Sequence, residues 1–592
     1  MKTLLRLLRF FGRVGGLFVL LGFASLELQA NPLPHVYTPH LDDTFPHLAD
    51  KYYHDAAAWP AIVQATNQAA ESDPRFSAIE SPRVVQPGQR LVIPPAEQLE
   101  PLLAAYEVTH RVDDLVSDPA AAALTAAWLA DFAADVDQAR RHFGIPGVAL
   151  AIVQDNRIVL AQGFGERELG SGQPVTPDTV FGIGSTTKAM TSLLAATLVD
   201  EGKLGWDQPV SEIWPAFSLA DSEVARQLPL RDLLNMRSGV ARKDLAWSGV
   251  GLSPEEVMTS VAALEVKFPP GRVYQYNNQL VATGGYIATL AAGYPFGELG
   301  PGYAELLRQR VFEPVGMSGA TLSVEAVQAN PNHATPHDFT LEAQVLPTHF
   351  HADPGIAPAG AVNANVLDLA RFLITQLNQG LNQTGQRVVS AENLAETQQP
   401  QIEISPDFHY AMGWFVEKYE GVTVIWHDGD VLGFKSLLVM LPEAKIGLAL
   451  QTNRTISFGF AHSVRYHLLE ALYDLEIEQV AELKAQWTDF IERGLPGIRA
   501  KLVKTVTPEE VSAYVGQYTT GWRIERREDG VLQASRGPYQ WRLWSAGGGK
   551  FIVDNGFGIT SEVEFVSDDT GAVVLLVKLS NGEEGEFLKV GD

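Results

Sequence analysis

The chain contains no cysteine in its 592 residues. Because no disulfide can tie its parts together, each folded part must be stabilised by its own hydrophobic core. A chain of this length exceeds what one core supports, so we expect three or four domains. The lack of cysteine also excludes a cysteine nucleophile and a thiolate metal site.

The charge and the missing motifs exclude several classes of function. A formal net charge of -26 argues against nucleic acid or an anionic membrane surface as a partner. The 14 histidines form no H-E-x-x-H pattern, and no G-x-x-x-x-G-K-[ST] or G-x-S-x-G occurs. We therefore predict no metal, no cofactor, no nucleotide chemistry and no α/β-hydrolase fold.

Residues 1–30 are typical of a signal peptide. Basic residues precede the apolar run 14–26, and Ala30 provides a small residue before a cut. The run is shorter than the ~20 residues of a membrane-spanning helix, which makes a retained anchor the weaker alternative. We expect an exported protein, periplasmic, cell-wall-associated or extracellular, with no stable membrane span after processing.

Residues 31–97 show a strand-helix-helix-strand pattern. Helical spacing of apolar residues predicts two helices, and a Pro-Gly turn leads into a closing strand. The segment resembles a LysM domain in four short motifs: Asp43-Thr44, Tyr52-Tyr53, Pro87-Gly88-Gln89 and Leu91-Val92-Ile93-Pro94.

The LysM resemblance implies a ligand, which would be peptidoglycan or another N-acetylglucosamine polymer. Asp43, Thr44, Phe45 and Ile79 would then lie near the glycan. The alternative is a small domain that has kept this fold and lost the ligand. A Pro- and Ala-rich linker follows over residues 98–120.

From residue 121 helices and strands alternate. Two strands early in this region are expected to form a hairpin that turns at Asp155-Asn156. The stretch GIGSTTKAMTS stands at a later boundary between a strand and a helix. A short strand reaches Ser185, and the apolar spacing beyond it predicts a buried helix with Ser185 in its first turn. Residues i and i+3 share a helix face, so the Lys188 amine can reach the Ser185 hydroxyl. If burial lowers the pKa of this lysine, its neutral amine is a base for a seryl nucleophile. The alternative is a serine that only caps the helix.

Two further motifs favour the nucleophile. Tyr276-Asn277-Asn278 precedes a helix, and His427-Asp428-Gly429 ends a buried strand. S-x-x-K, Y-x-N and H-x-G in this order resemble the serine β-lactamase and penicillin-binding protein superfamily, in the branch with D-alanyl-D-alanine peptidases, D-aminopeptidases and esterases. The resemblance covers residues 121–476 and implies an α/β (α+β) domain with a central antiparallel sheet flanked by helices.

This resemblance implies a role for each matching position. Ser185 would be acylated, Lys188 would deprotonate it, and Tyr276 would pass the proton on as a phenolate or as a relay. Asn278 would bind the substrate amide or hold Lys188. The backbone N–H groups of Ser185 and Asp430, which follows Gly429, would form the oxyanion hole.

The third motif bears on the substrate, because many relatives have lysine where His427 stands. A histidine is mostly neutral near pH 7, which weakens the case for an efficient β-lactamase. Asp428 and Asp430 would repel a substrate carboxylate or favour an amine, unless both point to solvent.

Residues 477–507 form a polar, helical connector, and residues 508–592 alternate apolar and polar positions between Gly-containing turns. Six to eight short strands are expected there, as a barrel or sandwich that resembles the lipocalin-like domains appended to such hydrolases. We expect it to pack against the hydrolase domain or to form the rim of the active site.

The sequence thus predicts an exported serine hydrolase. The first hypothesis is a D-amino-acid-specific peptidase of the DD-carboxypeptidase or D-aminopeptidase type, held at the wall by the N-terminal domain. A carboxylesterase of the same fold, acting on small esters, is the enzymatic alternative. A catalytically weak peptidoglycan-binding wall protein is the alternative from another class.

Overall fold

The computed structural model describes most of the chain from residue 121 onward and parts of the chain before it. The described residues are 35–37, 48–49, 52, 58–73, 75–79, 89–95, 98–99, 101–103, 121–350, 353–475, 479–503, 511–527, 531–537, 539–554, 561–568, 572–579 and 583–591. The signal peptide predicted over 1–30 lies outside them, as do Asp43, Thr44 and Phe45. In these ranges no helix combines the length and the apolar character needed to cross a membrane.

The largest domain is built on an eight-stranded antiparallel sheet in the order β4-β3-β14-β13-β12-β11-β10-β9. Its strands are β3 (Gly147–Gln154), β4 (Arg157–Gly165), β9 (Ile402–Ser405), β10 (Phe408–Tyr410), β11 (Phe415–Tyr419), β12 (Val422–Val431), β13 (Phe434–Leu441) and β14 (Ile446–Thr452). Strands β13 and β14 are buried along their whole length, so both faces of the sheet must be covered. The predicted flanked antiparallel sheet is confirmed.

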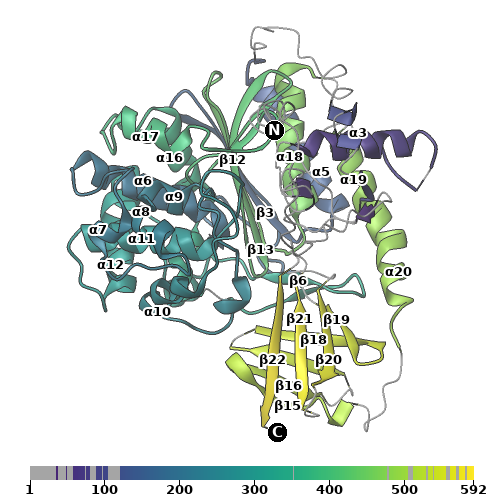
Figure 1. Cartoon of the computed structure of the whole chain (residues 1–592). Helices are drawn as coiled ribbons and strands as arrows, with labels where there is room; N and C mark the ends of the chain where they lie inside the picture. Colours follow the sequence, from purple (N-terminus) through teal and green to yellow (C-terminus); the bar gives the residue numbers. More distant parts are fainter. Residues whose placement is uncertain are drawn as a thin grey trace, which may run out of the picture.

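Helices cover the two faces of this sheet (Figure 1). The larger layer contains α6 (Thr187–Asp200), α9 (Leu230–Leu234), α11 (Asn278–Ala291), α12 (Leu299–Leu307), α16 (Val366–Leu377) and α17 (Ala391–Gln398). On the opposite face lie α5 (Ala126–His142) and α18 (Phe458–Tyr473). The main core spans both layers, and the short segments that bear the three motifs are packed inside it.

The predicted hairpin turn at Asp155-Asn156 is present between β3 and β4. Both residues have positive φ, 45° and 70°. Two consecutive positive φ angles are those of a type I′ turn, whose twist matches that of paired strands, and Asn and Asp tolerate them well. Local sequence chemistry thus sets the register of the first two strands.

In the N-terminal segment, β1 (His35–Tyr37) pairs antiparallel with β2 (Leu91–Ile93). Helix α3 (Trp59–Ala70) packs against this pair and buries Trp59, Ile62 and Val63. These elements occupy the positions predicted for the two outer strands and the second helix. Whether the segment is a LysM domain stays a prediction, since most of the residues predicted to form the first helix lie outside the described ranges.

The C-terminal part is a closed barrel of eight strands, as the alternation predicted. Its strands are β15 (Gly516–Tyr518), β16 (Trp522–Arg526), β17 (Leu532–Arg536), β18 (Tyr539–Gly547), β19 (Lys550–Asp554), β20 (Glu562–Ser567), β21 (Val573–Lys578) and β22 (Glu584–Gly591). The connector before it contains α19 (Gln479–Asp489) and α20 (Leu495–Arg499). The barrel lies below one end of the central sheet, beside β6 (His337–Phe339) (Figure 1).

Candidate active site

Ser185 stands where a short strand meets a buried helix. Strand β5 (Phe181–Gly182) leads into the 3-10 turn η3 (Gly184–Thr186), which continues as α6. Neither η3 nor α6 has a side-chain cap. The Ser185 hydroxyl instead contacts Lys188 and Tyr276, so the capping alternative does not describe this serine.

Lys188 is surrounded by three hydrogen-bonding oxygens. Its Nζ lies 2.9 Å from Ser185 Oγ, 2.8 Å from Asn278 Oδ1 and 2.8 Å from the Ala359 carbonyl oxygen. The side chain is 1% exposed. Burial holds the pKa of Lys188 well below its usual range, the charge of Arg242 acts in the same direction, and Asp244 and Asp428 oppose it.

The three contacts of Lys188 can be made by an ammonium or by a neutral amine, and burial favours the neutral amine. Such an amine has two N–H donors and one lone pair. The amide oxygen of Asn278 and the carbonyl of Ala359 can only accept, so they take the two N–H groups. In the neutral form the lone pair is left for the Ser185 O–H, an arrangement that suits Lys188 to the predicted role of base.

Tyr276 completes the group around the serine hydroxyl. Its phenol donates to Ser185 Oγ over 2.9 Å. Burial raises the pKa of Tyr276, which its bond to Ser185 partly opposes. Of the two forms that the sequence left open, the structure therefore supports the protonated phenol, which can relay a proton.

Strand β12 forms the opposite wall of the site. A Cβ at Gly429 would lie 2.0 Å from the Ile183 carbonyl oxygen and 2.8 Å from the Ser185 amide nitrogen. A Cβ at Gly184 would lie 2.7 Å from the Asp430 amide nitrogen. Only glycine at both positions permits this approach, which brings the two predicted oxyanion N–H groups side by side.

His427 is buried in this wall and is neutral. It is 1% exposed, and its Nε2 lies 3.0 Å from the Tyr410 hydroxyl. Burial lowers the pKa of His427 to about 4, against the opposing effect of Asp428. The third motif therefore carries no cation near pH 7, as the sequence suggested.

The two aspartates beside His427 neither face the substrate nor simply point to solvent. Side chains alternate along a strand, and Gly429 faces Ser185, so Asp428 and Asp430 point to the other face of the sheet. There both bind Lys435, which is 1% exposed, with a distance of 2.6 Å for Asp430. The expectation that they repel a substrate carboxylate is replaced by an ion-pair cluster.

The neutral state of His427 predicts a loss of stability in acid. Its pKa is 6.5 in the unfolded chain and about 4 in the folded one, so below pH 6.5 the unfolded chain binds more protons. We expect about 3 kcal/mol of the free energy of unfolding to disappear between pH 6.5 and 4 on this account.

Urea unfolding at several pH values checks this expectation on the wild type and His427→Gln, whose amide can still meet Tyr410. The variant should lose less stability on acidification. A residual loss remains, because burial also lowers the pKa of His462 to about 4. Identical pH slopes for the two proteins would show that His427 is already charged or solvated.

Several groups of the site were not identified from the sequence. The Ala359 carbonyl belongs to α15 (Ala357–Gly360) and is a backbone atom without a sequence signal. Arg242 lies 5.2 Å from the Tyr276 ring centroid and binds Asp244 over 2.6 Å. Lys435 was detectable in principle, since it stands directly across from Asp430 in the β12–β13 hairpin.

Of the residues predicted to bind glycan, only Ile79 is described. Its side chain is 6% exposed and packs in the same cluster as Trp59. Asn67 fixes its backbone, with Oδ1 accepting from the Ile79 N–H and Nδ2 donating to its carbonyl. Ile79 thus contributes to a core, and its place near a glycan stays a prediction.

The sequence model of the Beta-lactamase family matches residues 132–473, which is more than half of the chain. The match includes Ser185, Lys188, Tyr276, Asn278 and His427. The chain belongs to the beta-lactamase family. It is 29% identical over 352 residues to penicillin-binding protein 4 of Amycolatopsis lactamdurans, which covers 58% of this chain and 90% of the relative. It is 28% identical over 380 residues to an unguisins hydrolase of Aspergillus campestris, covering 61% and 68%.

Among solved structures, the octameric penicillin-binding protein homologue from Pyrococcus abyssi is similar in fold. It has a TM-score of 0.51 and 22% identity, and the match covers 78% of this chain and 99% of that one. With these relatives and the geometry around Ser185, this family member is a serine hydrolase. In the described part of the chain no group of acidic or histidine side chains could hold a metal.

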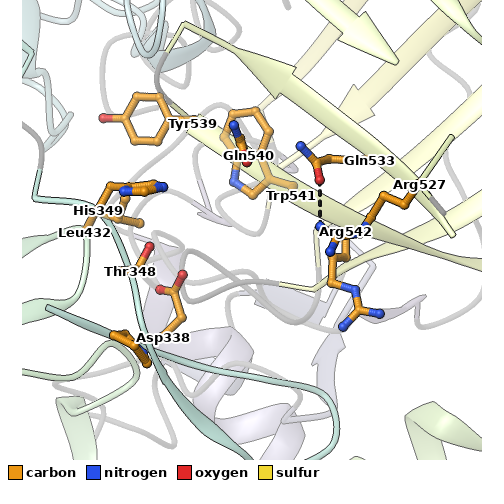
Figure 2. Close-up of a pocket in the computed structure, with 11 residues that line it drawn as sticks. Asp338, Thr348, His349, Leu432, Arg527, Gln533, Tyr539, Gln540, Trp541 and Arg542 are labelled. Atoms are coloured by element: carbon orange, nitrogen blue, oxygen red, sulfur yellow. Dashed lines mark hydrogen bonds between the residues drawn. The ribbon is translucent and has the colours of Figure 1, made fainter. Parts of the chain in front are cut away.

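A cleft lies where the barrel meets the hydrolase domain (Figure 2). It has a volume of about 180 Å³. Leu432, in the turn directly after β12, and His349 line one side, and the barrel contributes Tyr539, Trp541 and Arg542. The barrel therefore borders the strand end that forms the wall of the active site.

Proposed function

We propose that this protein is an exported hydrolase that forms an acyl-enzyme on Ser185 and cleaves peptides containing D-amino acids at the bacterial cell wall. The observation that carries the hydrolytic chemistry is the three-oxygen setting of Lys188, which leaves its lone pair for the seryl proton. The likeness to a penicillin-binding protein supports a wall peptide as the substrate.

Acylation follows from the positions of the side chains. The Ser185 O–H proton moves to Lys188 Nζ while Oγ bonds to the substrate carbonyl carbon, whose oxygen becomes an oxyanion held by the N–H groups of Ser185 and Asp430. When the oxyanion collapses, the C–N bond breaks. Tyr276 gives its proton to the leaving amine and regains one from the Lys188 ammonium.

Deacylation uses the same groups in reverse. A water molecule takes the place of the leaving amine, gives its proton through Tyr276 to Lys188, and attacks the acyl carbon. Collapse of the second oxyanion breaks the bond to Ser185 Oγ, which recovers a proton from Lys188. A neutral, protonated tyrosine fits this relay because it can pass a proton in either direction.

The open edge of β12 supports a peptide substrate. Strand β11 pairs with β12 only as far as Trp426, so it leaves one side of residues 427–431 open. On their other side these residues pair with β13. An extended peptide can add to such an edge through its backbone. Because His427 is neutral, this edge supplies no cation for a substrate carboxylate, which weakens the case for a β-lactamase.

A panel of substrates tests the proposal on residues 31–592, with Ser185→Ala as the control. The panel contains a D-Ala-D-Ala peptide, a D-amino-acid amide, the matching L-amino-acid compounds, a chromogenic cephalosporin and a short-chain nitrophenyl ester. We expect Ser185-dependent turnover of a D-configured peptide or amide above its L counterpart. Turnover of the ester alone would replace the peptidase by an esterase, and turnover by Ser185→Ala would overturn the nucleophile.

Attachment to the wall is tested by sedimentation with insoluble peptidoglycan. Residues 31–592 and residues 98–592 are compared at equal concentration. We expect only the longer chain to sediment with the polymer. Equal recovery of both chains in the supernatant would leave residues 31–97 as a domain without a glycan ligand.

A further inference from the structure

The barrel forms hydrogen bonds to both ends of one short segment of the hydrolase domain. This segment, residues 244–248, contains the 3-10 turn η4 (Asp244–Ala246). At its start, the Glu583 carboxylate accepts from the N–H groups of Asp244, at 2.7 Å, and of Leu245, at 2.9 Å. At its end, Arg536 Nη1 donates to the carbonyls of Leu245, at 2.6 Å, and Ser248, at 3.1 Å.

The charges of Glu583 and Arg536 match the polarity of the turn that these two residues bind. The start of a helical turn presents unpaired N–H groups and its end presents unpaired carbonyls. Glu583 supplies an acceptor to the first and Arg536 supplies donors to the second. Arg536 is itself fixed, because it is 2% exposed and also donates to Thr520.

Packing fixes the same segment in position. The Leu245 side chain is 8% exposed and belongs to the hydrophobic core of the barrel, together with Trp522. Beyond the segment, a Cβ at Gly537 would lie 2.3 Å from the Gly249 carbonyl oxygen. Residues 244–248 therefore cannot shift without disturbing the barrel.

The other side of this segment faces the catalytic side chains. Asp244 Oδ1 lies 3.4 Å from Asn278 Nδ2, and Asn278 Oδ1 in turn accepts from Lys188. Asp244 also binds Arg242, whose guanidinium lies over the Tyr276 ring. The segment held by the barrel thus supplies Asp244, a charge that acts on the pKa of Lys188, and Asp244 in turn binds Arg242.

Resting on the function proposed above, we infer that the C-terminal barrel positions the active site. Through Glu583 and Arg536 it holds residues 244–248 so that Asp244 orients Asn278 and Arg242 stays over Tyr276. Glu583 and Arg536 are positioning residues, because they reach the reacting atoms only through the segment that they hold.

Packing of the barrel against the hydrolase domain does not by itself require a carboxylate at position 583. Burial raises the pKa of Glu583 to about 7, with the charge of Asp244 in the same direction, while its two N–H bonds and Arg242 oppose this. A carboxylate kept in such surroundings costs free energy that an apolar contact would not. Its two oxygens fix the orientation of two successive peptide groups, which an apolar contact cannot do.

The test compares Glu583→Gln with Glu584→Gln. Glutamine at 583 has one acceptor oxygen in place of two, and its NH₂ group would face one of the two N–H groups, so the start of the turn is no longer held. Glu584 is the matched control, since it is the next residue, its side chain is 67% exposed, and it pairs with Lys578. At a pH well above 7, where Glu583 is ionised, both variants lose one negative charge from the same stretch of the barrel.

Two rates are measured: hydrolysis of a short-chain nitrophenyl ester and labelling of Ser185 by a fluorophosphonate, which needs no natural substrate. For Glu583→Gln we expect both to fall by about 10- to 100-fold, since small misplacements of catalytic groups have such effects, with KM for the ester little changed. Arg242 lowers the pKa of Lys188 more strongly than Asp244 raises it. If Arg242 and Asp244 both leave their positions, the pKa of Lys188 should rise. The acidic limb of the kcat/KM profile should therefore move to higher pH.

Glu584→Gln should match the wild type in both rates and in the pH profile. If Glu583→Gln does so as well, whatever its melting temperature, the barrel only packs and the inference is wrong. If Glu583→Gln does not fold, Arg536→Lys replaces it, because one ammonium cannot bond the carbonyls of Leu245 and Ser248 and also replace the two donations to Thr520 that fix the arginine. A wild type that is not labelled at Ser185 would instead overturn the proposed function itself.

Discussion

Arginine in place of Lys188 should lower kcat/KM by about 10⁴-fold, the upper range for loss of a general base. A guanidinium stays protonated in a protein, so no lone pair remains for the Ser185 O–H. The Asn278 and Ala359 oxygens that now accept from Lys188 Nζ can still accept from arginine. The loss therefore reports the missing base rather than missing hydrogen-bond donors.

This prediction is checked by the rate of fluorophosphonate labelling and by ester turnover. Lys203→Arg is the matched control: it makes the same chemical change just after the end of α6, where the side chain is 41% exposed. We expect the control to keep the wild-type rates. If Lys188→Arg retained more than about one tenth of the activity, another group would have to be the base.

The candidate site was largely predictable because three separate motifs agree in order. The i, i+3 spacing placed Lys188 on the helix face of Ser185, and the structure puts the two groups 2.9 Å apart. Tyr276 and Asn278, some ninety residues later, contact the same pair. Their meeting follows from the family resemblance and not from any local pattern.

Contacts made by backbone atoms, and contacts between domains, could not be predicted from the sequence. The Ala359 carbonyl has no residue type to mark it, and the approach of Gly184 to Asp430 depends on the path of two distant segments. The directions of Asp428 and Asp430 depend on which face of β12 meets Ser185, and a shift of one residue would reverse both. The link from Glu583 to Asp244 joins positions 339 residues apart.

The fold was predicted best where local chemistry decides it. The Asp155-Asn156 turn and the alternation in the barrel strands are set by neighbouring residues, and both are confirmed. The order of the central strands is different, because β3 pairs with β14 across nearly three hundred residues. Such pairing is selected by the burial of whole faces, which no single stretch of sequence reveals.

The wall of the oxyanion hole provides the second large expected effect. Gly429→Ala should lower kcat/KM by about 10²- to 10³-fold, the range found when one oxyanion donor is lost. The added methyl group would meet the Ile183 carbonyl oxygen at 2.0 Å and the Ser185 amide nitrogen at 2.8 Å, and both are backbone atoms. To relieve these contacts β12 must move away from η3, which separates the N–H groups of Ser185 and Asp430.

The separation should affect the transition state more than the bound substrate, since the charge on the oxygen develops only there. We therefore expect kcat to fall with little change in KM, and labelling by the fluorophosphonate, whose oxygen occupies the same hole, to slow in parallel. Gly497→Ala is the control, because nothing lies within 4 Å of a Cβ there. Full activity of Gly429→Ala in a protein that melts like the wild type would show that the oxyanion donors lie elsewhere. It would also contradict the assignment of the Asp430 N–H as one of these donors.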